Sequence, residues 1–145
     1  MPSRWGQTPR SSVAALCAAR GRDQVVAGCL DLLGGAEVDS ALILGLGGPP
    51  ARWAVNPDEK PGPDYWLRVW ALRGLLYAWD DQAEPSVLHA LTDEAWRVRE
   101  MAIKVVARHH LDNALPVVAE LRQDGVARVR DAAHRAVRSL TVADD

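Results

Sequence analysis

The chain has 145 residues, of which 48% are hydrophobic and 25% charged. This composition does not predict wholesale disorder, and the length predicts one domain with its own core. Its formal net charge is −2, which gives no overall attraction to nucleic acid or to an anionic membrane. Any electrostatic partner must therefore be recruited by a local patch of charge.

The N-terminal part of the chain predicts a flexible end followed by short helices. Residues 1–10 read as a loose terminus, and from Ser11 onward apolar residues recur at helical spacing with no alternating strand. Residues 11–21 and 23–35 predict two helices, the second with Asp23 as N-cap and a Gly-Gly stop. Residues 37–48 predict a third helix.

The two cysteines do not predict a disulfide framework. Cys17 and Cys29 have no CxxC spacing, which favours two buried thiols in a reducing cytoplasm. Arg20, Arg22 and Asp23 stand just before Cys29, where a lipoprotein signal would need an apolar stretch. No apolar run approaches the roughly 18–20 residues that span a bilayer. We therefore expect a cytoplasmic protein without a membrane partner.

A proline-rich insertion is expected at residues 47–63. Proline cannot occupy a helix interior, so this stretch is predicted to be a loop. A loop of this length within a compact domain is usually functional or mobile. The five prolines are Pro49, Pro50, Pro57, Pro61 and Pro63.

After the insertion, the sequence repeats itself every 31 residues. Equivalent positions carry the same kinds of side chain in three copies, as in Leu67/Val98/Val129, Arg68/Arg99/Arg130, Ala71/Ala102/Ala133 and Leu75/Val106/Val137. Shorter apolar segments precede the second and third copies, at residues 85–91 and 115–121, and each is followed by an acidic turn, Asp93 or Asp124. The repeating unit is thus a short helix, a tight turn and a longer helix.

A helix pair cannot bury its apolar face alone, so stacked copies are what makes a core. Three copies are clear if residues 38–46 form the short helix of the first, and residues 11–35 read as a degenerate fourth. The sequence predicts an all-α fold: a right-handed α-solenoid of three to four helix pairs, forming a single domain over residues 11–140 with an acidic tail at 141–145.

The repeats "DEAWRVREMAIKVVA" and "DGVARVRDAAHRAV" resemble the short HEAT-like repeats of the phycobilisome-lyase type. The resemblance covers roughly residues 37–140 and is strongest from residue 84. The first copy departs from the pattern, with the proline-rich insertion and "YWLRVWALRGLL" where Val-Arg should open the helix. The resemblance implies that Asp93, Arg99, Asp124 and Arg130 join neighbouring repeats rather than form a site.

One face of the longer helices is predicted to be exposed and basic. Helical spacing in residues 94–109 predicts a buried stripe of Val98, Met101, Ala102, Val105 and Val106. The opposite side carries Arg97, Glu100, Lys104 and Arg108, and the third copy places Arg128, Asp131 and Arg135 there. Stacking would align two rows, Trp66–Arg97–Arg128 and Arg73–Lys104–Arg135, which the HEAT resemblance puts on the concave side.

Two interpretations of this face stay open. It is either a partner-binding groove or a solvated helix surface with ion pairs such as Glu100–Lys104 and Asp131–Arg135.

The first copy is apolar where the other two are charged. Trp66, Val69 and Tyr77 occupy the groove positions next to Arg73, while Trp70 takes a core position. Either the aromatic groups are exposed as an anchor for a partner, or the insertion folds over them with Trp53 inserted.

Motifs for catalysis, cofactors and metals are weak. "GLGG" at residues 45–48 is followed by Pro49 and Pro50, where a phosphate-binding loop needs a helix N-terminus. His109 and His110 are adjacent and cannot point to one metal, and Asp80 and Asp81 fit helix caps. No serine or cysteine has the context of a nucleophile. No enzyme, cofactor or metal site is predicted.

The leading hypothesis is a non-catalytic scaffold that binds another protein, with an acidic surface, through the aromatic anchor and the basic rows. The binding residues would be Trp53, Trp66, Arg73, Tyr77, Arg97, Lys104, Arg108, Arg128 and Arg135. The alternative is nucleic-acid binding, because HEAT-like DNA glycosylases hold duplex DNA in a basic groove of similar chemistry. A lyase-related role rests on the family resemblance alone.

Overall fold

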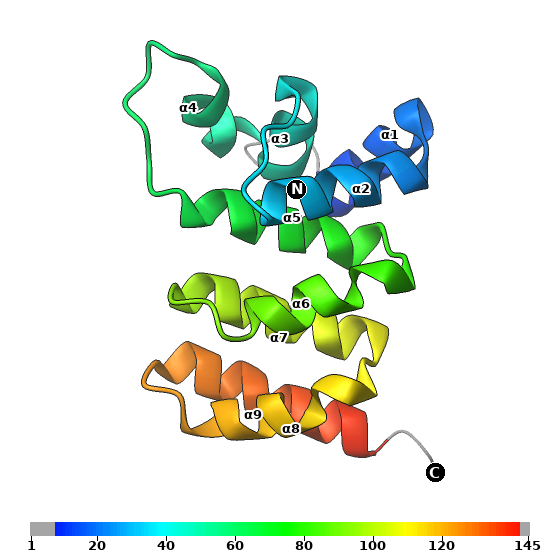
Figure 1. Cartoon of the computed structure of the whole chain (residues 1–145), viewed down its shortest axis with the longest axis vertical. Coiled ribbons are helices and arrows are strands. Elements are labelled where there is room, and N and C mark those ends of the chain that lie inside the picture. The colour runs from blue at the N-terminus through cyan, green and yellow to red at the C-terminus, as the bar shows by residue number, and fades with distance from the viewer. Residues whose placement is uncertain (1–7, 143–145) are drawn as a thin grey trace. The chain divides into compact units, whose positions relative to one another are not determined.

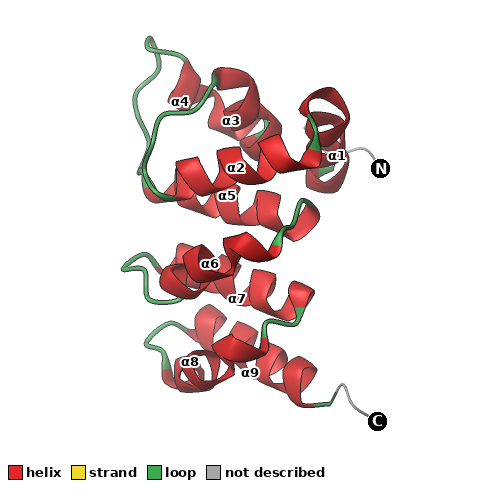
Figure 2. Cartoon of the chain, turned by 45° about the vertical axis from the view of Figure 1, so that its right-hand side comes forward, coloured by secondary structure: helices red, strands yellow, loops and turns green. Residues whose placement is uncertain are grey.

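The computed structural model describes residues 8–142, and over this range it contains nine α-helices, short 3-10 turns and no strand (Figure 2). The predicted all-α class is confirmed. Of the two predicted tails, residues 1–7 and 143–145 lie outside the described range. The chain divides into two compact units, Met1–Ala83 and Glu84–Asp145.

The first unit holds five helices, and its longer ones pack on one another. They are α1 (Pro9–Arg20), α2 (Arg22–Leu33), α3 (Ser40–Gly47), α4 (Arg52–Val55) and α5 (Tyr65–Tyr77). Helix α2 packs along α5, and α1 packs on α2 and α3 (Figure 1). These contacts match two stacked helix pairs, α1–α2 and α3–α5.

Local capping explains where the first helices begin. The Thr8 hydroxyl accepts a hydrogen bond from the Ser11 amide at 3.1 Å, and Pro9 opens the helix. Helix α1 therefore starts inside residues 1–10, which were predicted to be flexible. The predicted N-cap of α2 is also corrected. Gly21, with φ of +88°, makes the turn from α1, so α2 begins at Arg22 and Asp23 lies in its first turn.

The proline-rich segment is partly helical, which corrects the prediction of a loop over residues 47–63. Gly47 ends α3, Pro49–Ala51 form a 3-10 turn, and Arg52–Val55 form α4. Pro49 and Pro50 occupy the first two positions of this turn, where the backbone N–H that proline lacks would have no partner within the turn. Residues 56–64 then lead to α5 without regular structure.

The second unit contains two helix pairs. They are α6 (Glu84–Ala90) with α7 (Trp96–His109) and α8 (Leu115–Glu120) with α9 (Ala127–Thr141). Each short helix packs on its long one, and α7 packs along α9 (Figure 1). Helix α9 extends through Thr141, so the predicted acidic tail starts at least one residue later than expected.

The period of 31 residues is visible in the burial pattern. Ala71, Ala102 and Ala133 occupy equivalent positions on α5, α7 and α9, and none has measurable exposed area. Small side chains at these positions let neighbouring helices approach closely. The periodic positions therefore carry the cores of both units.

The two cysteines are free thiols in the first unit. Cys29 is buried, and its burial raises the pKa of the thiol to about 12. Cys17 is half-buried rather than buried as predicted, and burial also raises its pKa. Because the thiolate is the reactive form, neither cysteine is activated as a nucleophile.

Candidate functional site

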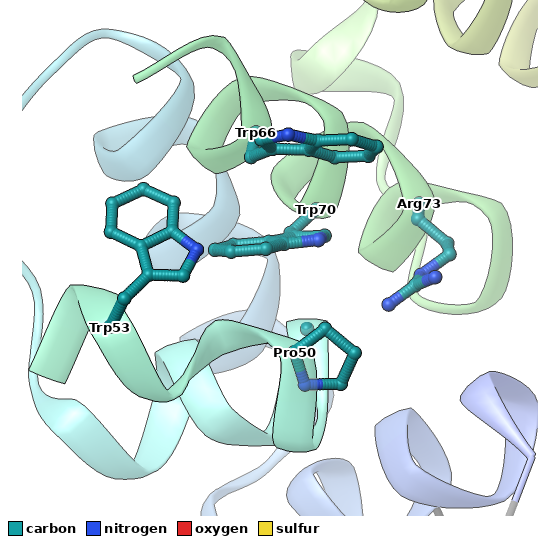
Figure 3. Close-up of a pocket in the computed structure, with 6 residues that line it drawn as sticks. Pro50, Trp53, Trp66, Trp70 and Arg73 are labelled. Atoms are coloured by element: carbon teal, nitrogen blue, oxygen red, sulfur yellow. The ribbon is translucent and has the colours of Figure 1, made fainter. Parts of the chain in front are cut away.

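Helix α5 presents a row of aromatic side chains in the first unit. Trp66 and Trp70 are four residues apart and therefore lie on one face of the helix. Their rings stack at a centroid separation of 6.3 Å with an interplanar angle of 23°. Trp70 is 4% exposed, whereas Trp66 is half-buried. Trp70 thus forms a floor over which Trp66 is partly accessible (Figure 3).

The proline-rich segment adds a third tryptophan to this row. Helix α4 brings Trp53 against Trp70, with ring centroids 5.7 Å apart. Behind Trp53 the chain returns along the indole, because a Cβ built on Gly62 would lie only 2.8 Å from Trp53 Cε2. Glycine is therefore needed there for the backbone to approach the ring. The segment supplies a wall of the aromatic cluster.

A pocket of about 410 Å³ opens beside the three indoles. We call it the tryptophan pocket; it is lined by Gly47, Pro50, Trp53, Trp66, Trp70 and Arg73. In Figure 3, Arg73 lies on the opposite side of Trp70 from Trp53. The pocket thus combines an apolar aromatic end with a cationic end.

Arg73 is held in place at the cationic end. Its Nη2 donates a hydrogen bond of 2.7 Å to the carbonyl of Leu46, near the end of α3. Burial lowers the pKa of Arg73, and the neighbouring Tyr77 opposes that shift. Arginine titrates so high that the group stays charged at neutral pH. Among the described residues, no side chain lining the pocket is acidic.

The first unit gathers three of the four site residues predicted for it. Trp53, Trp66 and Arg73 line the tryptophan pocket. Tyr77 does not; it is exposed further along α5, with the Arg10 guanidinium 5.7 Å from its ring centroid. Val69, predicted at a groove position, is only 6% exposed. That part of the prediction is wrong, and the equivalent position of the next copy, Glu100, is buried as well.

In the second unit, two arginines lie against the ring of one tryptophan. The Arg97 and Arg128 guanidinium carbons lie 4.4 and 5.4 Å from the Trp96 ring centroid. Arg128 Nε also donates to Glu100 Oε2 at 3.0 Å, which ties α9 to α7. Glu100 is only 8% exposed, so its prediction as an exposed residue is wrong. The cause is this contact from the next long helix, which spacing along α7 does not reveal.

The remaining predicted basic residues of the second unit are exposed. Lys104 and Arg108 lie on α7, and Arg135 lies on α9. Together with the two arginines beside Trp96 they form what we call the basic face: Arg97, Lys104, Arg108, Arg128 and Arg135. The parts of the predicted rows that would join this face to Trp66 or Arg73 stay predictions.

The four residues predicted to join repeats make a regular set of contacts. Arg99 donates to Asp124 through Nε at 2.9 Å and Nη2 at 3.1 Å, linking α7 to the turn before α9. Arg99 Nη1 also donates to the Asp93 carbonyl at 2.9 Å, and Arg130 Nη1 donates to the Asp124 carbonyl at 2.7 Å. The same contact thus recurs one repeat later.

The Asp124 carboxylate is held ionised in this position. Burial raises its pKa, but hydrogen bonds from Arg99 and the Val126 amide, with the charges of Arg99 and Arg130, outweigh burial and lower it. Asp93 accepts the equivalent amide hydrogen bond from Ala95 at 2.9 Å. Each acidic turn therefore caps the backbone ahead of the long helix that follows.

Comparison with known proteins identifies the repeats. A family model described as HEAT repeats matches residues 60–138, which is more than half of the chain. The chain belongs to the HEAT-repeat family. HEAT repeats commonly mediate protein–protein interaction, and HEAT-repeat proteins are generally non-catalytic scaffolds. No curated protein and no solved structure matches this HEAT-repeat chain significantly.

Sequence reasoning missed part of both surfaces of this HEAT-repeat protein. Pro50 and Gly47 line the tryptophan pocket, and the Trp96 ring lies against Arg97 and Arg128 of the basic face. A signal for Trp96 was available, since it stands next to Arg97 at the start of a long helix. Gly47 gave no signal: its role is to let Trp70 approach α3, where a Cβ would lie 2.8 Å from the indole.

Residues 8–142 contain neither a candidate metal cluster nor a candidate membrane span. No three histidine, cysteine or carboxylate side chains come together as a metal site. None of the helices in that range has both the length and the apolar character needed to cross a membrane.

Proposed function

We propose that this HEAT-repeat protein is a non-catalytic scaffold that binds another protein, and that the tryptophan pocket is its main anchor. The observation that carries the proposal is the pocket itself, in which three indoles and a fixed arginine surround one opening. Tryptophan and arginine are the residues most enriched at binding hot spots, where they fill well-packed and desolvated contacts.

The basic face serves as a second, electrostatic contact in this proposal. Its exposed Lys104, Arg108 and Arg135 complement an acidic partner surface, which speeds association more than it adds affinity. The chain's net charge of −2 places this attraction in a patch rather than in the molecule as a whole. Binding is therefore expected to depend strongly on Trp66 and only moderately on salt.

The decisive experiment compares two substitutions in one binding assay. The natural partner is first isolated by cross-linking and affinity purification of the full chain, and its affinity is then measured directly. Trp66→Ala should weaken binding by about tenfold or more, the loss typical of a hot spot, and Arg97→Ala by less. Leu44→Ala, an exposed apolar residue of α3 in the same unit, is the control and should change little.

Nucleic-acid binding is the competing outcome of this experiment. Arg97, Trp96 and Arg128 have the chemistry that contacts phosphates and bases, but the Glu100 carboxylate within the cluster opposes a phosphate. If nucleic acid is what co-purifies, affinity should fall steeply with salt, and Arg97→Ala should be the more damaging change. That ranking would overturn the protein-binding proposal.

A further inference from the structure

The tryptophan pocket has features that point to the chemistry of its ligand, given the proposed protein-binding function on which this inference rests. We propose that the pocket binds a proline-rich segment of the partner, in an extended polyproline conformation, with a carboxylate next to the prolines. The prolines would lie on Trp53 and Trp66, beside the buried floor formed by Trp70, and the carboxylate would meet Arg73.

The aromatic end of the pocket suits flat, rigid apolar groups. Trp66 and Trp53 are half-buried above the floor formed by Trp70, so indole surface remains accessible beside the opening. Proline-rich ligands dock in aromatic-lined grooves because their extended helix is already formed and loses little entropy on binding. Pro50 narrows the same opening without adding a charge.

The chain itself places such a segment against one of these indoles. Residues 61–63 read Pro-Gly-Pro, and the Gly62 backbone lies so close to Trp53 that a Cβ there would be 2.8–3.1 Å from three atoms of the indole. A proline-flanked backbone therefore already packs on Trp53 within the first unit. The proposed ligand makes the same kind of contact inside the pocket.

The cationic end selects the charge of the ligand. Three indoles alone would also suit a cation such as a methylated lysine, which aromatic cages bind through cation–π attraction. Here a fixed guanidinium lines the pocket, and none of the described residues that line it is acidic. A ligand cation would be repelled, whereas a carboxylate gains a charge-assisted hydrogen bond in a site partly shielded from water. An acidic proline-rich segment satisfies both ends.

The test uses the full chain and a synthetic peptide of four prolines followed by two aspartates. Binding is followed through the indole N–H signals in a ¹⁵N–¹H correlation spectrum, where the six tryptophans give six separable probes. Single Trp→Phe variants assign these signals. The peptide should shift the signals of Trp53, Trp66 and Trp70, and leave those of Trp79 and Trp96 in place.

Matched peptides separate the two halves of the inference. Replacing the aspartates by lysines should weaken binding about tenfold, as expected for loss of a charged hydrogen bond. Replacing the prolines by alanines should weaken it by a similar factor. A lysine or trimethyl-lysine peptide that binds as well as the acidic one would overturn the proposed ligand charge, and an equally tight alanine peptide would overturn the role of proline.

Protein variants provide the complementary control. Arg73→Gln retains a donor for the Leu46 carbonyl but removes the charge, so it should weaken binding of the acidic peptide about tenfold. Binding of a further peptide, four prolines without the aspartates, should be unchanged. Arg68→Gln, on the same helix but outside the pocket, should change neither. Circular dichroism checks that each variant is folded.

The outcome also distinguishes this inference from the proposed function. If no proline-rich peptide binds, yet Trp66→Ala still weakens the natural partner, the ligand assignment is wrong and protein binding at the pocket stands. If Trp66→Ala leaves the natural partner unaffected as well, both proposals are wrong.

Discussion

Arg99 combines more interactions than any exposed basic residue described above. It donates twice to the Asp124 carboxylate and once each to the Asp93 and Glu94 carbonyls, while its side chain is 17% exposed. Pairs at the surface contribute little to stability, but a buried carboxylate left without its partner is costly. The position therefore matters for stability rather than for charge on the surface.

We expect Arg99→Ala to destabilise the second unit by about 2–4 kcal/mol, because Asp124 would keep a buried charge and two carbonyls would lose a donor. Urea denaturation measures the change. Arg135→Ala, an exposed residue of α9, is the control and should shift the free energy of unfolding by less than about 0.5 kcal/mol. Equal effects from the two substitutions would contradict this account.

We expect Asp39 to make the stability of the first unit depend on pH in acid. It accepts two hydrogen bonds from Arg20, at 2.8 and 3.1 Å, and one from the Leu42 amide at the start of α3. The Arg20 hydrogen bond is the main cause that lowers its pKa to about 2, from 3.8. Because the folded-state pKa lies below the unfolded one, the associated stability is present above about pH 4 and is lost as pH falls towards 2.

Asp39→Asn should therefore flatten the pH dependence of thermal unfolding between pH 4 and 2. Asparagine still caps α3 but carries no charge to protonate. The midpoint temperature, followed by circular dichroism from pH 2 to 5, provides the measurement. Asp31→Asn, at an exposed position on α2, should keep the acid sensitivity of the natural chain. A variant with unchanged acid sensitivity at position 39 would rule out the ion pair as its source.

At the scale of elements, α5 packs closely on α2 and α3 within the first unit. A Cβ built on Gly74 would lie 2.6 Å from Leu46 Cδ2 and 2.8 Å from Cys29 Sγ. The glycine thus sets the distance at which α5 packs on both α2 and α3. The close packing of α5 on α2 and α3 at this position offsets the low helix propensity of glycine.

Gly74→Ala should destabilise the protein by about 1–3 kcal/mol, because overpacking outweighs the gain of up to about 1 kcal/mol in helix propensity. Gly125→Ala is the matched control. It has open space around its Cβ position and no positive φ, so its effect should be near zero or slightly stabilising. Chemical denaturation of the two variants side by side would reveal a wrong assignment if their order were reversed.

The packing of the long helices could be predicted from the sequence only in part. The period of 31 residues predicts the long helices and the burial of Ala71, Ala102 and Ala133, since repetition samples one environment three times. It fails where the environment differs between copies. Val69 and Glu100 occupy equivalent positions and are both buried, Glu100 in contact with Arg128 from another helix, whereas their third equivalent, Asp131, is exposed. The spacing of residues along one helix does not predict which side chains of other helices will contact it.

The tryptophan pocket could also be predicted from the sequence only in part. Trp66 and Arg73 share a face by helical spacing, and that much follows from the sequence. The approach of Trp53 depends on α4, a helix of four residues inside a stretch whose prolines predicted a loop. The close packing at Gly47 and Gly62 likewise depends on tertiary structure, because a glycine in a sequence does not say which side chain comes near it.

On the scale of the whole molecule, the division into two compact units predicts how the protein opens. Repeat proteins are stabilised mainly between neighbouring repeats, so damage to one contact is expected to remain largely local. Arg99→Ala should therefore speed amide hydrogen exchange across residues 84–142 and leave α1–α3 protected. Hydrogen exchange with mass spectrometry reads each region separately. A uniform increase along the chain would indicate one cooperative domain instead.

In the second unit, the residues that join helix pairs differ from the residues that present charge to solvent. Arg99 and Asp124 fasten one helix pair to the next, while Lys104, Arg108 and Arg135 on the same long helices face solvent. Surface residues of this kind can be exchanged without disturbing the fastening. The exposed residues of the second unit can thus be substituted, in evolution or by design, to change what the surface binds with little effect on folding.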